Sequence, residues 1–299
     1  MENQQNKTCS ISLNDLRAEI DKVDDQLISL LGSRMKIIDR VGELKKSNNE
    51  KFLIRSNREA DMIKNLIKKS DSSFPKSSII SIWRKIIAAA NMHEQNLKIS
   101  IHNPKNIPDY SYLVREHYNE EVPIFSHDSL TNIVTEIEKG ETQIGVFSLP
   151  KANQEGAKPD ESSDNWWINL ANNKSGIKVF AKLPFVEFSD KKTNIQDSSN
   201  LVMVAIKEAE KSSEDNSLLY VEVPKEISKS QILSSFKENK LDAKILKSVK
   251  LAQVENMMFY LVEVSGFYEE SDVALKNFSK SKIKPYVKVL GCYALPIKI

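Results

Sequence analysis

The sequence has few of the residues that form crosslinks and metal sites. Its 299 residues include two cysteines, Cys9 and Cys292, which lie near opposite ends of the chain. Two such distant thiols indicate neither a disulfide framework nor a zinc site. The four histidines show no zinc-ligand spacing, and we interpret them as surface or packing residues. They are His93, His102, His117 and His127. We therefore expect no metal and no cofactor.

Long hydrophobic runs are also missing. The first ten residues, MENQQNKTCS, contain no signal core, and no apolar run approaches the length of a membrane span. We therefore expect a cytoplasmic protein, in a reducing compartment, that does not bind membranes. The net charge of +2, from 43 basic and 41 acidic residues, gives no indication of a nucleic-acid partner. A chain of this length is expected to form two or three domains.

Arginine is scarce outside one region. Lysine supplies nearly every positive charge in the later part of the chain, whereas six of the seven arginines fall before residue 97. Because a guanidinium group binds a carboxylate or a phosphate through two parallel hydrogen bonds, this distribution indicates anion binding by the N-terminal region.

The spacing of apolar residues between residues 12 and 46 predicts one very long helix. Ser12 followed by Asp15 is typical of a capping box, and we expect the helix to end at Ser47 to Asn49. The helix would be about 50 Å long, too long to be covered by a small monomer, so we expect coiled-coil-like pairing with a second copy. The apolar stripe consists of Leu13, Leu16, Ile20, Val23, Leu27, Leu30, Ile37, Val41 and Leu44.

Three cations on this helix are candidates for binding an anion. Arg34 falls on the apolar stripe, where a buried guanidinium needs an anionic partner. Arg17 and Lys45 are about 42 Å apart along a straight helix, so they cannot hold one small ligand within one chain. In an antiparallel homodimer, Arg17 of the second copy would join Arg34 and Lys45 around one anion. The simpler alternative is that all three side chains are solvated.

Two shorter helices are expected before residue 97. The first opens with Ser56 and Glu59, spaced as in a capping box, and the other follows Pro75. Arg58 and Glu59 lie at a helix start, which favours a negative ligand, although Glu59 could equally complete the capping box. Glu94 falls on the apolar face of the third helix, where a protonated acid can donate a hydrogen bond. Its alternative is an exposed position at a fraying helix end.

From residue 97 the pattern changes to α/β. We expect a polar tail at residues 1–10, a helical unit at 11–96, an α/β region at 97–206 and a C-terminal domain at 217–299, with a charged linker at 207–217. The C-terminal domain has a strand–helix–strand–strand–helix–strand order, which predicts a ferredoxin-like βαββαβ fold. The other strands expected are 98–101, 144–149 and 201–206, with a helix at Leu130–Lys139.

Residues 11–96 resemble the AroQ-class chorismate mutases, which are all-helical and form intertwined dimers. The order and spacing of several short strings carry this resemblance. They are L-x-x-L-R-x-x-I-D-x-V-D-x-Q-L from Leu13 to Leu27, then Arg34, V-G-E-L-K at 41–45, R-x-x-R-E-A at 55–60 and I-W-R at 82–84.

The resemblance implies an isomerase that converts chorismate to prephenate in phenylalanine and tyrosine biosynthesis. It implies that Arg17 of one chain, with Arg34 and Arg58 of the other, holds the two substrate carboxylates. Lys45 would face the ether oxygen whose bond breaks, and Glu59 would bind the ring hydroxyl.

Two positions depart from the common pattern of that family. Ala90 stands where a serine is usual, and Glu94 stands where a glutamine usually donates a hydrogen bond to the ether oxygen. Only a protonated Glu94 can donate that bond. We therefore expect turnover to fall with rising pH, and Glu94→Gln to flatten that profile.

The later regions are similar to a degenerate prephenate dehydratase fused to an ACT domain. The segments G-E-T-Q-I-G-V-F at 140–147 and V-K-V-L-G-C-Y at 287–293 carry this resemblance. The catalytic Thr-Arg-Phe of that family is replaced near residues 199–201, and its Glu-Ser-Arg-Pro effector motif is replaced near 251–254. The resemblance therefore implies loss of dehydratase activity and leaves binding of an aromatic amino-acid effector open.

Three alternatives to a simple mutase remain. The first is a bifunctional mutase–dehydratase, and the second is a non-enzymatic regulator that senses amino acids. The third is a basic nucleic-acid binder, which the sequence disfavours because the first 96 residues hold 17 basic and 13 acidic residues.

Overall fold

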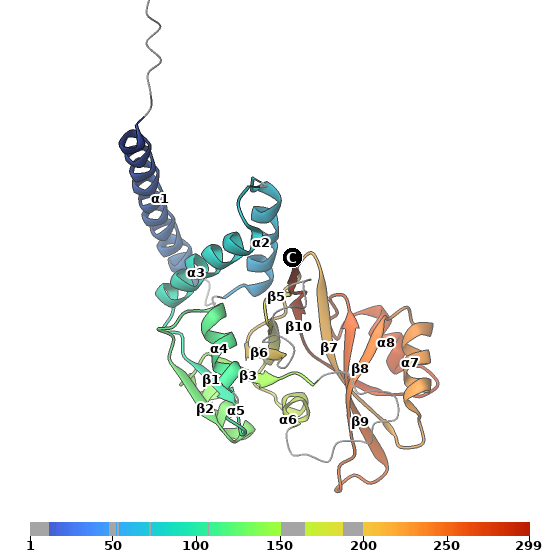
Figure 1. Ribbon diagram of the computed structural model, residues 1–299. Coiled ribbons are helices and arrows are strands. Elements are labelled where there is room, and N and C mark those ends of the chain that lie inside the picture. Colours follow the sequence, from blue (N-terminus) through green and yellow to red (C-terminus); the bar gives the residue numbers. More distant parts are fainter. Residues whose placement is uncertain are drawn as a thin grey trace, which may run out of the picture. The chain divides into compact units, whose positions relative to one another are not determined.

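The structure is a computed structural model, and it divides the chain into two compact units, residues 1–50 and 51–299 (Figure 1). The residues that the structure describes are 12–47, 52, 54–71, 73–106, 108–150, 165–187 and 200–299. The polar tail predicted for residues 1–10 lies outside them.

In its described residues, the first unit is one helix, α1 (Leu13–Ser47), of 35 residues. Its predicted capping box is confirmed, because the Ser12 backbone N–H donates to Asp15 Oδ2 at 2.9 Å and the Asp15 N–H donates to Ser12 Oγ at 3.2 Å. These hydrogen bonds lower the pKa of the Asp15 carboxyl group. The apolar stripe is exposed along the whole helix, from Leu13 at 63% through Leu30 at 65% to Leu44 at 66%. The helix therefore has an uncovered apolar face.

The second unit begins with the two shorter helices, α2 (Ser56–Lys69) and α3 (Lys76–Glu94). Both helices are predicted correctly, but the capping box proposed for Ser56 and Glu59 is wrong. Arg55 occupies the N-cap position, and no side chain caps the first turn. The Glu59 carboxylate instead accepts hydrogen bonds from side chains of α3, one of which is a cation. A hydrogen bond from a cation is stronger than one from the neutral backbone N–H of a capping box.

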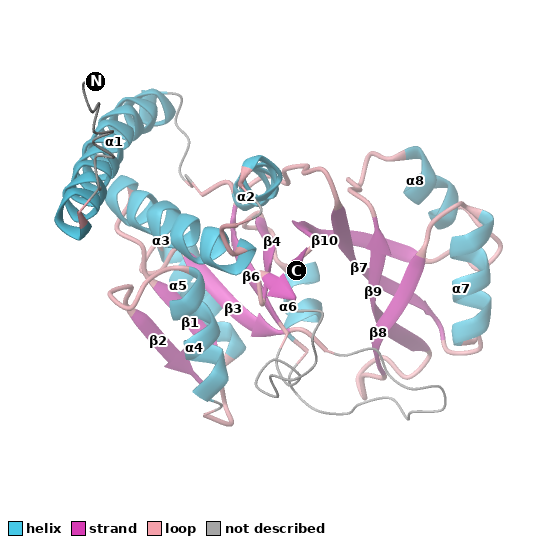
Figure 2. Ribbon diagram, turned by 45° about the horizontal axis from the view of Figure 1, so that its top comes forward, coloured by secondary structure: helices cyan, strands magenta, loops and turns pink. Residues whose placement is uncertain are grey.

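A nine-stranded sheet in the order β2-β1-β3-β6-β4-β10-β7-β9-β8 forms the body of this unit (Figure 2). Strands β1, β2 and β3 are parallel, and most of the other pairs are antiparallel, so the sheet is mixed. The nine strands are β1 (Ile99–His102), β2 (Ile124–His127), β3 (Ile144–Ser148), β4 (Ile177–Leu183), β6 (Leu201–Ile206), β7 (Asp215–Pro224), β8 (Ala243–Val249), β9 (Met257–Ser265) and β10 (Tyr286–Ala294). The short strands β5 (Val186–Glu187) and β11 (Ile297–Lys298) pair separately.

Helices α4 (Pro108–His117), α5 (Leu130–Lys139) and α6 (Trp166–Asn172) accompany the first half of the sheet. The bounds of α5 are those predicted. A Cβ atom added to Gly145 of β3 would lie 2.9 Å from Ile133 and Ile137 side chains of α5. The missing side chain therefore lets α5 pack closely on the sheet.

The C-terminal part follows the predicted βαββαβ order, β7-α7-β8-β9-α8-β10. Its two helices, α7 (Lys229–Glu238) and α8 (Val273–Ser279), lie side by side on one face of the sheet (Figure 2). Phe236 of α7 stacks on Phe278 of α8, with ring centroids 3.9 Å apart. Successive side chains of β7 point to opposite faces of the sheet and so contribute to two hydrophobic cores. Leu219, Val221 and Val223 belong to the core under these helices, whereas Leu218 and Tyr220 belong to the core that contains α6.

The sheet is continuous between the two α/β parts, because β10 pairs with β4 where Gly291 faces Val179. None of the helices that the structure describes combines the length and the apolar character needed to cross a bilayer.

Candidate active site

The six predicted site residues are divided between the two units. Arg17, Arg34 and Lys45 lie on α1, which is a unit of its own. The other three lie on the helices of the second unit, with Arg58 exposed in the first turn of α2 and Glu94 half-buried at the last position of α3. The third, Glu59, is buried and has well-defined partners.

Glu59 is held by two side chains of α3. The Arg84 Nη1 atom lies 2.8 Å from Glu59 Oε2, and the Asn91 Nδ2 atom donates to Glu59 Oε1 at 3.0 Å. Arg84 is 4% exposed and Glu59 is 9% exposed, so the ion pair is shielded from solvent. Each carboxylate oxygen therefore accepts one hydrogen bond from α3.

Arg84 has further partners on the opposite side, at the end of α4. Its Nη2 and Nε atoms donate to the backbone oxygen of His117 at 3.0 and 3.3 Å, and Nη2 lies 2.9 Å from His117 Nε2. The guanidinium also lies 5.0 Å from the centre of the Phe185 ring. Arg84 thus links α2, α3 and α4.

His117 is a neutral partner in this network. Burial, together with the positive charges of Arg84 and Lys85, holds its pKa well below the ordinary value. Because a guanidinium can only donate, Nε2 accepts from Arg84 and the ring proton lies on Nδ1. Arg84 and His117 also line a cavity of about 100 Å³ between α3, α4 and the turn that contains Phe185.

Arg84 and Asn91 were not among the residues predicted from the sequence. Both could have been suspected, because they are polar residues spaced seven apart on α3, where the helix otherwise buries apolar side chains. A polar pair at this spacing lies on one face of a helix, and when buried it needs a partner.

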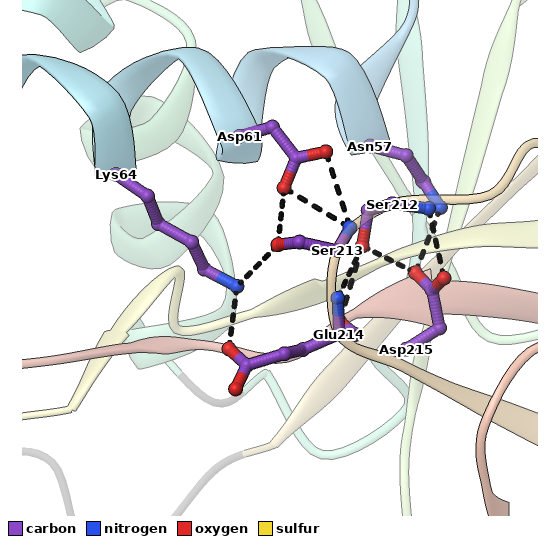
Figure 3. Close-up of polar contacts among 7 residues, drawn as sticks. All are labelled: Asn57, Asp61, Lys64, Ser212, Ser213, Glu214 and Asp215. Carbon is purple, nitrogen blue, oxygen red and sulfur yellow. Dashed lines mark hydrogen bonds and ion pairs between the residues drawn. The ribbon is translucent and has the colours of Figure 1, made fainter.

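A second set of polar contacts fixes the start of α2 to the segment before β7 (Figure 3). Asn57 Nδ2 donates to Asp215 Oδ1 at 3.1 Å and to the backbone oxygen of Glu210 at 2.5 Å. The Asp215 carboxylate also accepts the Ser212 N–H at 2.8 Å and the Ser212 hydroxyl at 2.5 Å. Asn57 and Asp215 are both buried, so this junction is a satisfied internal network.

The same face of α2 continues the junction one and two turns later. The Asp61 carboxylate accepts the Ser213 N–H at 3.1 Å and the Ser213 hydroxyl at 2.5 Å, while Lys64 Nζ lies 2.9 Å from Glu214 Oε2 (Figure 3). The segment 207–217, expected to be a charged linker, therefore contacts α2 through Glu210, Ser213, Glu214 and Asp215.

Lys207, at the start of that segment, is itself nearly buried. Its amine donates to the backbone oxygen of Ile54 at 3.1 Å and lies 3.4 Å from Glu210 Oε2. It also lies over the Phe52 and Phe180 rings. Burial lowers the pKa of this amine, partly offset by Glu210. The segment thus contributes to the core beside α2 rather than spanning open solvent.

No group of three histidine, cysteine, aspartate or glutamate residues in the described part of the chain is arranged to hold a metal ion.

Comparison with known proteins agrees with the helical region. Residues 16–95 match the family model of chorismate mutase type II. This match confirms the resemblance predicted for residues 11–96. The bifunctional chorismate mutase/prephenate dehydratase of Aquifex aeolicus (strain VF5) is 30% identical over 97 residues, which cover 31% of this chain. The match spans only 26% of that relative.

Two solved structures are similar to the larger part of the chain. The prephenate dehydratase from Streptococcus mutans is 16% identical with a TM-score of 0.46, covering 68% of this chain and 100% of that one. The prephenate dehydratase in complex with L-Phe from Arthrobacter aurescens is 10% identical with a TM-score of 0.45, covering 67% of this chain and 90% of that one.

Proposed function

We propose that this protein is a chorismate mutase that isomerises chorismate to prephenate in aromatic amino-acid biosynthesis. The match of residues 16–95 to chorismate mutase type II carries the proposal. The cations and acids of the predicted site fall within those residues. This Claisen rearrangement needs no nucleophile, because an enzyme can accelerate it by holding the substrate in its reactive shape and by stabilising charge on the ether oxygen.

In the proposed site, two copies of the chain bind each substrate. Arg17 of the partner copy, with Arg34 and Arg58, binds the two carboxylates, and Lys45 faces the ether oxygen. Glu59 accepts a hydrogen bond from the ring hydroxyl. Glu94, when protonated, donates a second hydrogen bond to the ether oxygen.

The homodimer belongs to the same proposal. The uncovered apolar stripe of α1 supports it, because exposed stripes of this length are stabilised by pairing. A second α1, antiparallel to the first, brings Arg17 of one copy beside the later turns of the other. We place the enzyme in the cytoplasm, which suits the free buried thiol of Cys292.

Chorismate consumption by the purified full chain tests the activity. We expect prephenate to accumulate, and we expect Arg34→Ala to lower kcat/KM by about 10²-fold or more, as for loss of one charge-stabilising group. Arg40→Ala, which removes an exposed arginine of the same helix, is the matched control and should keep the activity. A wild-type chain that consumes no chorismate at any pH would refute the mutase and favour the non-enzymatic regulator.

Glu94 has its own test. If its protonated acid donates to the ether oxygen, turnover falls as rising pH removes that proton, and Glu94→Gln flattens the profile because an amide donates at every pH. An identical slope in both proteins would remove Glu94 from the mechanism.

A bifunctional mutase–dehydratase is the second candidate, favoured by the bifunctional relative from Aquifex aeolicus. Phenylpyruvate formed from chorismate would support it, and accumulation of prephenate alone would support a mutase with a degenerate dehydratase region. We further propose that the domain at residues 217–299 is ACT-like and binds an aromatic amino acid. A change of mutase rate with added phenylalanine or tyrosine is the readout.

A further inference from the structure

We propose that Arg84 is a positioning residue for the mutase reaction, which acts by fixing the orientation of the Glu59 carboxylate. The inference rests on the proposed function, because it takes Glu59 as the group that binds the substrate hydroxyl. It adds Arg84, and with it Asn91, to the residues that determine the rate.

The geometry of the Glu59 carboxylate carries the proposal. Arg84 and Asn91 lie two turns apart on α3 and donate to different oxygens, at 2.8 and 3.0 Å. Neither the guanidinium nor the amide nitrogen can accept a hydrogen bond, so both oxygens act as acceptors. A carboxylate oxygen has two lone-pair sites, and each oxygen keeps one for a further donor such as a substrate hydroxyl. The two bonds from α3 thus fix the direction of the remaining acceptor sites.

Arg84 is itself held from behind. Its guanidinium donates to the His117 backbone oxygen and to His117 Nε2 and lies against the Phe185 ring. Because these four contacts hold the guanidinium from the side opposite Glu59, it cannot move with the Glu59 carboxylate if that group rotates. Misplacing a binding group by about 1 Å can lower the rate by about 10²-fold. We therefore expect a fixed carboxylate to support a higher rate than a mobile one.

A double-mutant cycle separates positioning from mere stability. The purified full-length variants are Arg84→Gln, Glu59→Gln and the combination, assayed for kcat and KM with chorismate. We expect Arg84→Gln to lower kcat/KM by about tenfold or more in the wild-type background and by less than about twofold when Glu59 is already glutamine, since residues that act through one contact are not additive. Lys85→Gln removes the neighbouring exposed cation and is the matched control.

Two further variants keep the test decisive if Arg84→Gln does not fold. Arg84→Lys retains the charge and should recover part of the lost kcat/KM, and Asn91→Ala removes the other donor and should also lose its effect in the Glu59→Gln background. Thermal unfolding of each variant shows that the compared proteins are folded at the assay temperature.

The outcomes distinguish the two proposals. Additive losses in both backgrounds, or wild-type kcat/KM in Arg84→Gln, would overturn the role of Arg84 while leaving an active mutase. A wild-type chain without mutase activity would instead overturn the function on which the role depends.

Discussion

At the scale of single residues, the buried network around Arg84 makes His117 a pH-sensitive part of the fold. Burial and the nearby cations lower its pKa in the folded state well below the ordinary value of about 6.5, which applies to the unfolded chain. Below about pH 6.5, His117 therefore binds a proton in the unfolded chain but stays neutral in the folded chain. The stabilisation from neutral His117 is complete above that pH and is lost as the pH falls toward the folded pKa.

His117→Gln tests this assignment. We expect the wild-type free energy of unfolding to fall between pH 7 and pH 5 by up to about 1.4 kcal/mol per pH unit from this residue alone. The variant should lack that component, because glutamine does not titrate. Urea unfolding at several pH values gives both curves, and parallel curves for the two proteins would contradict the assignment.

Gly291 shows how one small residue can determine a contact between two strands. Its φ of +136° is rarely adopted by other residues, and a Cβ atom there would overlap the backbone of Val179 on β4. Gly291→Ala should therefore lower the free energy of unfolding by about 3 kcal/mol or more. Gly140→Ala is the control, because Gly140 also has a positive φ but open space around it, and should cost about 1–2 kcal/mol. Equal losses in urea unfolding would show that the overlap is relieved cheaply.

Sequence reasoning at this scale succeeds where the cause is local. The cap between Ser12 and Asp15 depends on three consecutive peptide units, and it is predicted correctly. The cap proposed for Ser56 fails because Glu59 finds a cation 25 positions away. Nothing within the first turn of α2 reveals that competing partner.

At the scale of elements, periodicity predicts the long helices, and the elements that it misses are each ten residues long or shorter. The bounds of α5 and β6 agree with the sequence pattern, and the βαββαβ order is confirmed. Helices α4 and α6 and strands β2 and β4 were not predicted. A helix of seven residues such as α6 makes fewer than two full turns, so its apolar residues repeat too few times to form a pattern.

The apolar face of α1 belongs to the same scale, and it gives a prediction about assembly. Leu27→Lys places a charge in the middle of the stripe, where Leu27 is 53% exposed. We expect the variant to be monomeric in sedimentation velocity at concentrations where the wild type is a dimer, with a parallel loss of mutase activity, because a charge buried in a paired seam is not compensated.

Asp25→Lys is the matched control for that experiment. Position 25 lies two residues from Leu27, about 200° around the helix, so the new lysine points away from the stripe. This variant should keep the sedimentation coefficient and the activity of the wild type. Dimers of undiminished stability in Leu27→Lys would show that the stripe does not form the interface.

At the scale of the whole molecule, polar contacts between segments far apart in the sequence affect where the domain boundaries lie. The change of pattern at residue 97 suggests that residues 11–96 form one unit, whereas contacts group α2 and α3 with the α/β part. The polar contacts of Asn57 with Asp215 and of Arg84 with His117 join segments that are far apart in sequence. Composition and periodicity do not record such pairings, so the sequence alone does not show which distant elements are in contact.

Truncation after residue 96 tests which grouping governs stability. The fragment loses the partner Asp215 of Asn57 and the partner His117 of Arg84, and it uncovers apolar residues that the later chain buries. Ile54 packs in the core of the first α/β region, and Ile63 and Ile80 pack against Ile297. Because burying such a side chain contributes about 1.5–3 kcal/mol, we expect the fragment to be less stable than the full chain by several kcal/mol. Its melting temperature by circular dichroism and its kcat/KM for chorismate should both fall.

A fragment with the melting temperature and the mutase activity of the full chain would contradict this expectation. It would place the boundary at residue 96, and the contacts of α2 and α3 with the α/β part would then contribute nothing to the mutase.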